Sequence, residues 1–343
     1  MIQFMLSKFL RVIGVLVGAT LITFLLMHAI PGNPWSNFAN NPRPQLGLTL
    51  DPPLRRDLNR HFGLDLPLWR QFTRYVVGDV LEDGSFYCGA VCGNLGPSIW
   101  QRGRSVQDIL FSAPEGKTYW QSRFGYSIRL VLFASLIAVG LGIPLGLVSG
   151  MKPRSGLSRV ISVVLAALMS IPNFVLGLLV IVVLVSWLHT FKVLPDWTIP
   201  SNWIVPAVVL AVMPMANIAR VTHASLENTL GEDYVRTARG KGLSERRVML
   251  VHVMRNAIVP IITFLGPTLM ELFAGLMIVE VMFGFPGFGR EYWESVLRLD
   301  YPMVMGLTLI YAVGIAIVNI AVDVLAEILD PRIRSLKQQG APR

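Results

Sequence analysis

The sequence contains few residue patterns that could do covalent chemistry. Gly116, Lys117 and Thr118 match the end of a nucleotide-binding P-loop, but Phe111 stands where the motif requires its first glycine. The five histidines are not clustered, so they provide little equipment for binding a metal. We therefore predict no catalytic residue, no metal site and no cofactor in this chain.

The most unusual polar run covers residues 232–256, EDYVRTARGKGLSERRVMLVHVMRN. It holds six Lys or Arg and three Asp or Glu in 25 positions of an otherwise apolar chain. A solvated loop is one interpretation. A structured connection is the other, and it is favoured by the apolar residues interleaved with the charges: Tyr234, Val235, Val248, Met249 and Val251.

The order of charges in this run predicts its local structure. Acidic residues at 232–233 followed by basic residues at 236–241 suit the dipole of a short helix. Gly240 and Gly242 permit the positive φ of a helix end, and Ser244 is a candidate N-cap for a second helix. The pattern therefore predicts a helix, a glycine turn and a further helix.

Two carboxylates, Glu271 and Glu280, lie in the apolar run 259–283. An acidic side chain in the middle of a membrane helix costs about 2.5–3.5 kcal/mol on insertion scales, so each needs a reason to be there. Nine residues at about 100° each rotate the helix by about 900°, which directs the two side chains to opposite faces. They cannot share one role.

These residues must be positioned by membrane helices. The chain has 53% hydrophobic and 15% charged residues, with a mean hydropathy of +0.56, whereas globular proteins carry about 25% charged residues. Crossing a bilayer takes about 20 helical residues, and six apolar runs reach or approach this length. They cover residues 12–30, 127–150, 160–187, 204–219, 259–283 and 303–325. We predict an all-α polytopic membrane protein with six transmembrane helices.

The distribution of Lys and Arg predicts the orientation. The first apolar run is longer than a signal-peptide core of about 7–15 residues and lacks a small-residue cleavage site, so we interpret it as an anchor. With both termini in the cytoplasm, the short outer loops hold only Lys192, Arg290 and Arg298, as the positive-inside rule requires. The net charge of +9 then reflects topology and anionic lipid rather than nucleic acid.

This N-in, C-in topology predicts four divisions of the chain. They are the N-terminus and first helix at 1–30, an extracytoplasmic segment at 31–126, a five-helix core at 127–330 with a cytoplasmic loop at 226–258, and a cytoplasmic tail at 331–343.

The predicted extracytoplasmic segment carries both cysteines of the chain, Cys88 and Cys92. In an oxidising compartment they could close a small disulfide loop, and two reduced thiols are the alternative. A metal site is disfavoured, since a closed zinc site needs four ligands and His61 is the only histidine of the segment.

Several motifs together resemble one family. The loop sequence DYVRTARGKGLSERRV resembles the cytoplasmic coupling loop of ABC importer permeases in the dipeptide and oligopeptide branch, which also contains nickel importers. The wider superfamily begins this loop with Glu-Ala-Ala and has a Gly four residues after the second Ala. Here the matching residues are Arg236, Thr237, Ala238 and Gly242. Further similar motifs are FLLMHAIPGNP (24–34), GIPLGLVSG (142–150), SIPNFVLGLL (170–179), IVEVMFGFPGFGREYWESVLRLDYPMV (278–304) and DPRIR (330–334). The region 79–120 departs from the family in length.

The resemblance implies a permease subunit of the inner membrane that moves short peptides into the cell by alternating access. Its implied partners are a homologous second permease, two ABC ATPases that bind ATP and Mg, and an extracytoplasmic solute-binding protein. The basic residues of the loop would pair with carboxylates of an ATPase, and Tyr234, Val235 and Leu243 would be its buried anchors. The residues implied in ATPase coupling are Tyr234, Val235, Arg236, Thr237, Ala238, Arg239, Lys241, Gly242 and Leu243.

The candidate pathway residues are Met270, Glu271, Phe273 and Glu280. We hypothesise that Glu271 faces the pathway and meets a peptide ammonium or a basic side chain. The alternative is a polar partner, such as a Ser, Thr or Asn on a neighbouring helix. For Glu280 a structural role, holding the turn that follows it, is the favoured interpretation.

The GFPGFG run after the fifth predicted span has the glycines and proline of a tight re-entrant turn with an apolar face. It could be an outer gate for the docked binding protein, or it could serve interfacial packing. The residues of this turn are Phe283, Gly284, Phe285, Pro286, Gly287, Phe288 and Gly289.

Other function classes fit less well. An intramembrane protease needs Ser and His at one depth, but His28 and Ser149 lie at opposite ends of their predicted spans. A secondary, ion-coupled transporter usually shows repeats and several ionisable residues near the midplane, and it has no use for an ATPase-docking loop. The choice among peptide, nickel or another small solute stays open, as do the role of the 79–120 region and the identity of the two ATPases.

Overall fold

The computed structural model describes residues 2–31, 34–35, 52–80, 84–101, 103–192 and 195–329 of the 343-residue chain. The chain divides into two compact units, Met1–Ser127 with Pro286–Gly314, and Ile128–Phe285 with Ile315–Arg343. The division falls within helices α6 (Arg123–Met151) and α14 (Tyr301–Leu329). The predicted cytoplasmic tail and the DPRIR motif lie outside the described residues.

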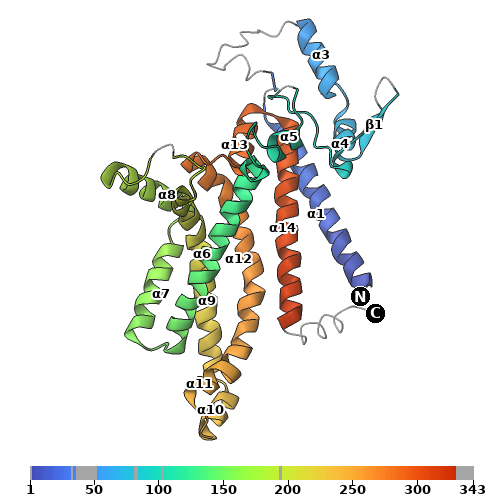
Figure 1. Cartoon of the computed structure of the whole chain (residues 1–343). Coiled ribbons are helices and arrows are strands. Elements are labelled where there is room, and N and C mark those ends of the chain that lie inside the picture. The colour runs from blue at the N-terminus through green and yellow to red at the C-terminus, as the bar shows by residue number, and fades with distance from the viewer. Residues whose placement is uncertain are drawn as a thin grey trace. The chain divides into compact units, whose positions relative to one another are not determined.

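The first unit combines one long helix with a set of short elements (Figure 1). Its apolar core joins the end of α1 to the start of α14 through Met27, Ile99, Leu299, Tyr301 and Val304. Its elements are α1 (Ile2–Ala29), α3 (Pro52–Phe62), α4 (Leu68–Val76), β1 (Gly78–Val80), β2 (Phe86–Cys88), the 3₁₀ turn η2 (Ala90–Cys92), α5 (Val106–Phe111), the 3₁₀ turn η3 (Tyr119–Gln121) and α13 (Phe288–Arg298).

Strands β1 and β2 form an antiparallel hairpin in which Gly78 pairs with Cys88 and Val80 with Phe86. Three residues per strand are too few to bury a sheet face, so this hairpin is an accessory to the helices. The all-α prediction therefore holds for the architecture and omits one small hairpin in the 31–126 segment.

Buried acidic side chains stabilise the corner between α13 and α14. Asp300 is 2% exposed and accepts hydrogen bonds from the Ser98 hydroxyl and from the backbone N–H groups of Ile99 (3.1 Å) and Trp100 (3.2 Å). Burial raises the pKa of Asp300, and these donors oppose the shift. In α13, Glu291 is 1% exposed and pairs with Arg123. These contacts attach the segment before α6 to the α13–α14 corner.

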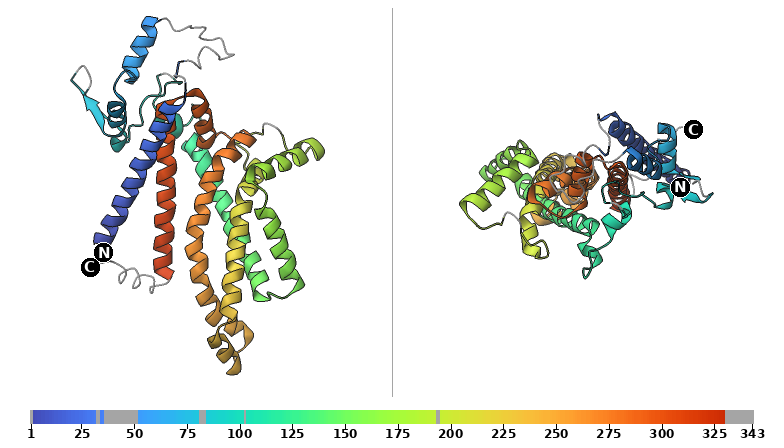
Figure 2. Two further views of the ribbon diagram at one scale, coloured as in Figure 1. Left: turned by 180° about the vertical axis from the view of Figure 1, so that it is seen from behind. Right: turned by 90° about the horizontal axis from the view of Figure 1, so that it is seen from above.

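The second unit is a bundle of long helices. Its most extensive packing joins α9 to α12, which run alongside each other in Figure 1 and in the left view of Figure 2, with α10 and α11 at their shared end. Its elements are α7 (Gly156–Met169), α8 (Asn173–Ile181), the π-helical η4 (Val182–Trp187), the 3₁₀ turn η5 (Pro200–Trp203), α9 (Ile204–Leu230), α10 (Asp233–Gly240), α11 (Glu245–Arg247), the π-helical η6 (Val248–Val253) and α12 (Met254–Phe283).

Three glycines at four-residue spacing let α6 approach α9 closely. A Cβ atom on Gly142 would lie 2.8 Å from the Met215 carbonyl oxygen, and one on Gly150 would lie 2.9 Å from Leu226 Cβ. Between them, a Cβ on Gly146 would clash with Thr222. Small residues of this kind allow close backbone packing between membrane helices, where no hydrophobic effect drives association.

The described helices confirm the six-span prediction only in part. Five are long and apolar enough to cross a membrane: Leu10–Ala29, Arg123–Met151, Pro200–Leu230, Glu245–Phe283 and Tyr301–Val322. The third predicted span, 160–187, is wrong as a single helix, because α7 and α8 form a pair bent by 96°. Pro172 explains the bend, since proline disfavours helical geometry at Ile171 before it and donates no hydrogen bond. The pair is a broken span or a re-entrant segment.

The fourth and fifth predicted spans are correct in place but too short. Residues 204–219 extend to Leu230, and residues 259–283 continue a helix that begins at Glu245. The added turns contain charged residues, which a hydropathy criterion excludes. Both helices therefore run without a break toward the polar loop at 232–256.

Candidate coupling surface and membrane carboxylates

The loop at 232–256 forms the predicted helix, glycine turn and second helix. Glu232 occupies the N-cap of α10, and Gly242, with φ of 75°, makes the turn. Gly240 is the last residue of α10 and has no positive φ, so only one of the two glycines is needed for the turn. Ser244 is at the predicted N-cap, but its backbone carbonyl rather than its hydroxyl accepts the Arg247 N–H at 2.9 Å.

One face of α10 is buried inside the chain. Val235 is fully buried and Ala238 is 5% exposed, in a cluster with Leu226 of α9, Val248 of η6 and Ala257 of α12. Their three-residue spacing puts them on the same helix face. The expectation that Val235 anchors a partner is therefore wrong, because its side chain is already enclosed by its own chain. Leu243 is partly buried against the same cluster.

The opposite face of α10 is exposed and carries the polar side chains. Tyr234 is 40% exposed, and its hydroxyl accepts a 2.9 Å hydrogen bond from Asn256. Arg239 donates two hydrogen bonds to Glu245, at 2.6 and 3.1 Å, across the glycine turn. The other exposed residues of the predicted set are Arg236, Thr237, Lys241 and Gly242. This face is available for contact with another protein.

The end of the bundle that carries α10 is cross-linked by polar contacts. The Ser225 hydroxyl of α9 donates to the Ala257 carbonyl of α12 at 2.8 Å, and His223 Nδ1 lies 3.1 Å from the Ser149 hydroxyl of α6. These hydrogen bonds link α6, α9 and α12 near the end of the bundle that carries α10.

The two membrane carboxylates lie on opposite faces of α12, as predicted. Glu271 is exposed, whereas Glu280 is fully buried. The Asn217 side chain of α9 donates a 3.1 Å hydrogen bond to Glu271 Oε2. Glu271 thus has a polar partner on a neighbouring helix, as the alternative to a pathway role supposed, but its side chain is still exposed. Met270 beside it is half-buried and Phe273 is 5% exposed, so Phe273 presents little surface to a pathway.

The turn at 283–289 begins at the C-cap of α12, where Gly284 has φ of 61°. Phe285 is fully buried, with its ring against Trp197 and Trp203 at centroid distances of 4.8 and 5.2 Å. The Phe285 N–H donates to the Glu280 carbonyl at 2.8 Å, so the backbone of Glu280 closes the turn.

The remainder of the turn is also packed. Gly287 is the N-cap of α13, and Phe288 is 1% exposed beside Phe124 and Tyr311. Its N–H donates to the Ser127 hydroxyl at 2.8 Å. Phe283 is 3% exposed. These contacts favour the packing interpretation of the turn over the gate interpretation, because the aromatic side chains of the turn are buried in the protein.

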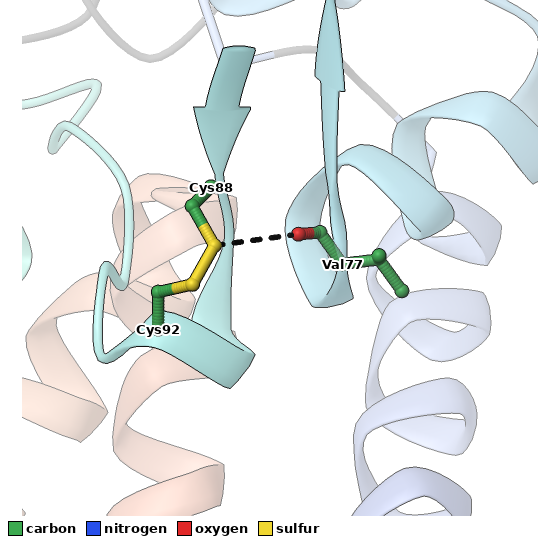
Figure 3. The surroundings of a disulfide bond; sticks show 3 residues. All are labelled: Val77, Cys88 and Cys92. Carbon is green, nitrogen blue, oxygen red and sulfur yellow. Dashed lines mark hydrogen bonds between the residues drawn. A yellow bond between two sulfur atoms is a disulfide. The ribbon is translucent and has the colours of Figure 1, made fainter.

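Cys88 and Cys92 are joined by a disulfide, with Cα atoms 5.9 Å apart (Figure 3). This Cα separation is within the range that a disulfide requires. Cys88 Sγ lies 3.8 Å from the Val77 carbonyl oxygen, so the bridge links the end of β2 to η2 beside the end of α4.

Sequence reasoning named the kind of partner for Glu271, a Ser, Thr or Asn on a neighbouring helix, but did not single out Asn217. A signal was present, because Asn217 is the one polar residue of the apolar run 204–219. Asp300 and Glu291 lie inside the motif 278–304 that carried the resemblance. Nothing in their spacing indicated Ser98 or Arg123 as partners, because those contacts join distant parts of the sequence.

Long apolar helices that carry an exposed, charged helix–turn–helix define an integral membrane protein. Residues 142–335 match the family described as binding-protein-dependent transport system inner membrane component. The chain is 33% identical to the dipeptide transport system permease protein DppB of Bacillus subtilis (strain 168), over 98% of this chain and 100% of that protein.

Two further relatives are similar over nearly their full length. The dipeptide transport system permease protein DppB of Escherichia coli (strain K12) is 32% identical, over 98% of this chain and 100% of its own. The oligopeptide transport system permease protein AppB of Bacillus subtilis (strain 168) is 30% identical, over 97% and 99%. Among solved structures, the crystal structure of an amino acid ABC transporter with histidines aligns with 62% of this chain and 93% of its own, at 18% identity and a TM-score of 0.46.

The chain therefore belongs to the family of inner membrane components of binding-protein-dependent transport systems. It is a non-catalytic membrane subunit of an ABC importer, and ATP is bound by partner ATPases rather than by this chain. A system of this class also implies an extracytoplasmic binding protein as a partner.

Proposed function

We propose that this chain is the permease subunit that moves short peptides into the cell by alternating access, with ATP hydrolysis transmitted through α10. The substrate follows from the relatives, which are named as dipeptide and oligopeptide permeases and are similar from end to end. The partners would be a homologous second permease and two ATPases. The termini and α10 would face the cytoplasm, as the Lys and Arg distribution predicts.

The observation that carries the coupling role is the division of α10 into two faces. Val235 and Ala238 attach the helix to α9 and α12, while Arg236, Arg239 and Lys241 are exposed. Basic side chains at an interface steer association and select partners with acidic surfaces. A helix attached on one face and contacted on the other can transmit a displacement of the ATPase to the membrane helices.

Within this function, we propose that Glu271 meets the ammonium or basic side chain of a peptide. Its exposure supports this role, and Asn217 would orient the carboxylate. A carboxylate in a membrane segment that is exposed and held by one neutral amide keeps acceptor capacity for a cation.

The coupling proposal is tested by comparing two glycine substitutions in the loop. A Cβ atom would meet nothing within 4 Å at either Gly240 or Gly242, but only Gly242 has a positive φ. Valine is strongly disfavoured there, so Gly242→Val should displace α11 from α10. Gly240→Val is the matched control, because that residue is helical.

The expected result is that Gly242→Val abolishes peptide-stimulated ATP hydrolysis by the reconstituted importer while the complex remains folded. Gly240→Val should retain most of the activity. Equal peptide uptake and ATP hydrolysis in both variants would contradict a role for the turn in coupling.

A further inference from the structure

The first unit contains a cavity of about 280 Å³ that the transport role does not use. It lies between the end of α1, helices α3 and α4, the β1–β2 hairpin and the start of α14. Its apolar walls include Phe24, Phe62, Ile99 and Met305. Its volume is just below the range of about 300–1,000 Å³ that is typical for drug-sized ligands, which favours a small ligand.

Arg74 is the one residue lining this cavity that carries a permanent charge. Arg74 lines it and makes no ion pair within the described part of the chain, while its guanidinium lies 5.7 Å from the centroid of the Tyr87 ring. His28 and His61 also line it, whereas none of its lining residues is Asp or Glu. The cavity therefore suits an anionic head group and has no carboxylate to receive an ammonium.

One polar atom beside the cavity lacks a protein partner. The Tyr75 hydroxyl is buried and makes no hydrogen bond among the described residues. A buried hydroxyl without a partner is unfavourable. Burial raises the pKa of Tyr75, so the group is protonated at physiological pH and can donate a hydrogen bond.

Other polar side chains at the cavity already have partners. His28 contacts the Phe24 carbonyl (2.8 Å) through Nδ1 and Gln71 Oε1 (3.2 Å) through Nε2. The Gln71 amide nitrogen donates to the Leu64 and Leu66 carbonyls, at 3.3 and 2.7 Å. Arg74, which makes no ion pair, and the Tyr75 hydroxyl, which has no hydrogen-bond partner among the described residues, are adjacent on α4 and keep capacity for a ligand.

We propose that this cavity binds a small monocarboxylate with an apolar body, the carboxylate meeting Arg74 and the Tyr75 hydroxyl. The apolar body lies among Phe24, Phe62, Ile99 and Met305. This chemistry is shared by the C-terminal residue of an apolar peptide and by a short fatty acid. The site uses no residue of α10 or α12, so it is independent of the coupling proposal.

The test measures binding to the complete importer in lipid nanodiscs by calorimetry. The probes are N-acetyl-phenylalanine, its neutral amide, and octanoate. N-acetyl-phenylalanine should bind at least about tenfold more tightly than its amide, because the amide lacks the charge that Arg74 pairs with. Preference for N-acetyl-phenylalanine over octanoate indicates a peptide terminus as the source, and the reverse preference indicates a lipid.

Two variants locate the site. Arg74→Gln should weaken binding about tenfold or more, and Tyr75→Phe about threefold to tenfold. Arg60→Gln is the matched control, because Arg60 is an exposed cation on α3 next to the lining residue His61 and does not itself line the cavity.

Tyr75→Phe also has a readout without ligand. Removing a hydroxyl that has no partner should leave the melting temperature of the free importer unchanged or higher, while the shift caused by N-acetyl-phenylalanine decreases. Equal binding of the acid and the amide, or unchanged binding of the acid in Arg74→Gln and Tyr75→Phe, would overturn the proposal.

Discussion

The helical stretch Glu245–Phe283 is entered and left through a glycine at positive φ, Gly242 at 75° and Gly284 at 61°. Beyond Gly284, the turn at 283–289 buries its aromatic side chains, and Phe285 is fully enclosed by aromatic neighbours. Before Gly242, α10 buries only its small apolar face and leaves its basic residues exposed. A glycine at positive φ therefore occurs in both connections. One connection buries its side chains in its own chain, and the other leaves its basic side chains exposed to solvent.

The largest expected effect is at the packed turn. Phe285→Ala removes a fully buried ring between Trp197 and Trp203. Cavities of this kind cost about 3–5 kcal/mol. Thermal unfolding of the purified protein should occur at a clearly lower temperature. Arg236→Ala, at an exposed residue of the other connection, is the control and should unfold as the parent does.

A smaller effect is expected at the buried face of α10. Val235→Ala should lower the free energy of unfolding of the loop region by about 1–3 kcal/mol, because Val235 is fully buried against α9 and α12. Hydrogen exchange of the α10 amides should become faster while exchange in α9 stays slow. Unchanged exchange in α10 would mean that Val235 does not hold this helix.

A still smaller change in stability is expected at the exposed face. Arg239 and Glu245 form a solvent-exposed ion pair with a 2.6 Å contact, and such pairs contribute about 0–1 kcal/mol. Arg239→Gln should therefore leave the melting temperature nearly unchanged but reduce peptide-stimulated ATP hydrolysis. A large loss of stability would show that the pair fastens the loop rather than serving the interface.

The smallest effect on the fold is expected at Glu271, which is exposed. Glu271→Gln keeps the hydrogen-bonding shape toward Asn217 but removes the charge. Uptake of peptides with Lys or Arg side chains should decrease relative to neutral peptides, and the melting temperature should not change. Equal uptake of both peptide classes would contradict a charge-recognition role.

Much of the helical architecture could be predicted from hydropathy, and the α10 turn from its glycines. Gly242 makes a turn that its sequence neighbours indicate, because positive φ is a local requirement. The break before Pro172 was also present in the sequence as the Ile-Pro dipeptide, but it lies within a continuous apolar run, and hydropathy does not detect a backbone break.

The division of α10 into buried and exposed faces could be predicted less well. Tyr234 and Val235 are both apolar in pattern, yet Val235 is enclosed by Leu226, Val248 and Ala257, whereas Tyr234 is 40% exposed. Their different environments depend on residues of α9, η6 and α12 that are distant from them in the sequence. The contact of Asp300 with Ser98 likewise joins residues 202 positions apart, which no local pattern specifies.

The central claim is that the exposed face of α10 contacts the ATPase, and site-specific photo-crosslinking tests it most directly. A photoreactive phenylalanine analogue at Arg236 should yield a covalent adduct with an ATPase subunit in intact membranes. The same analogue at Arg290, which lies on α13 of the first unit, is the comparison and should yield none. An ATPase adduct at Arg290 with none at Arg236 would contradict the account.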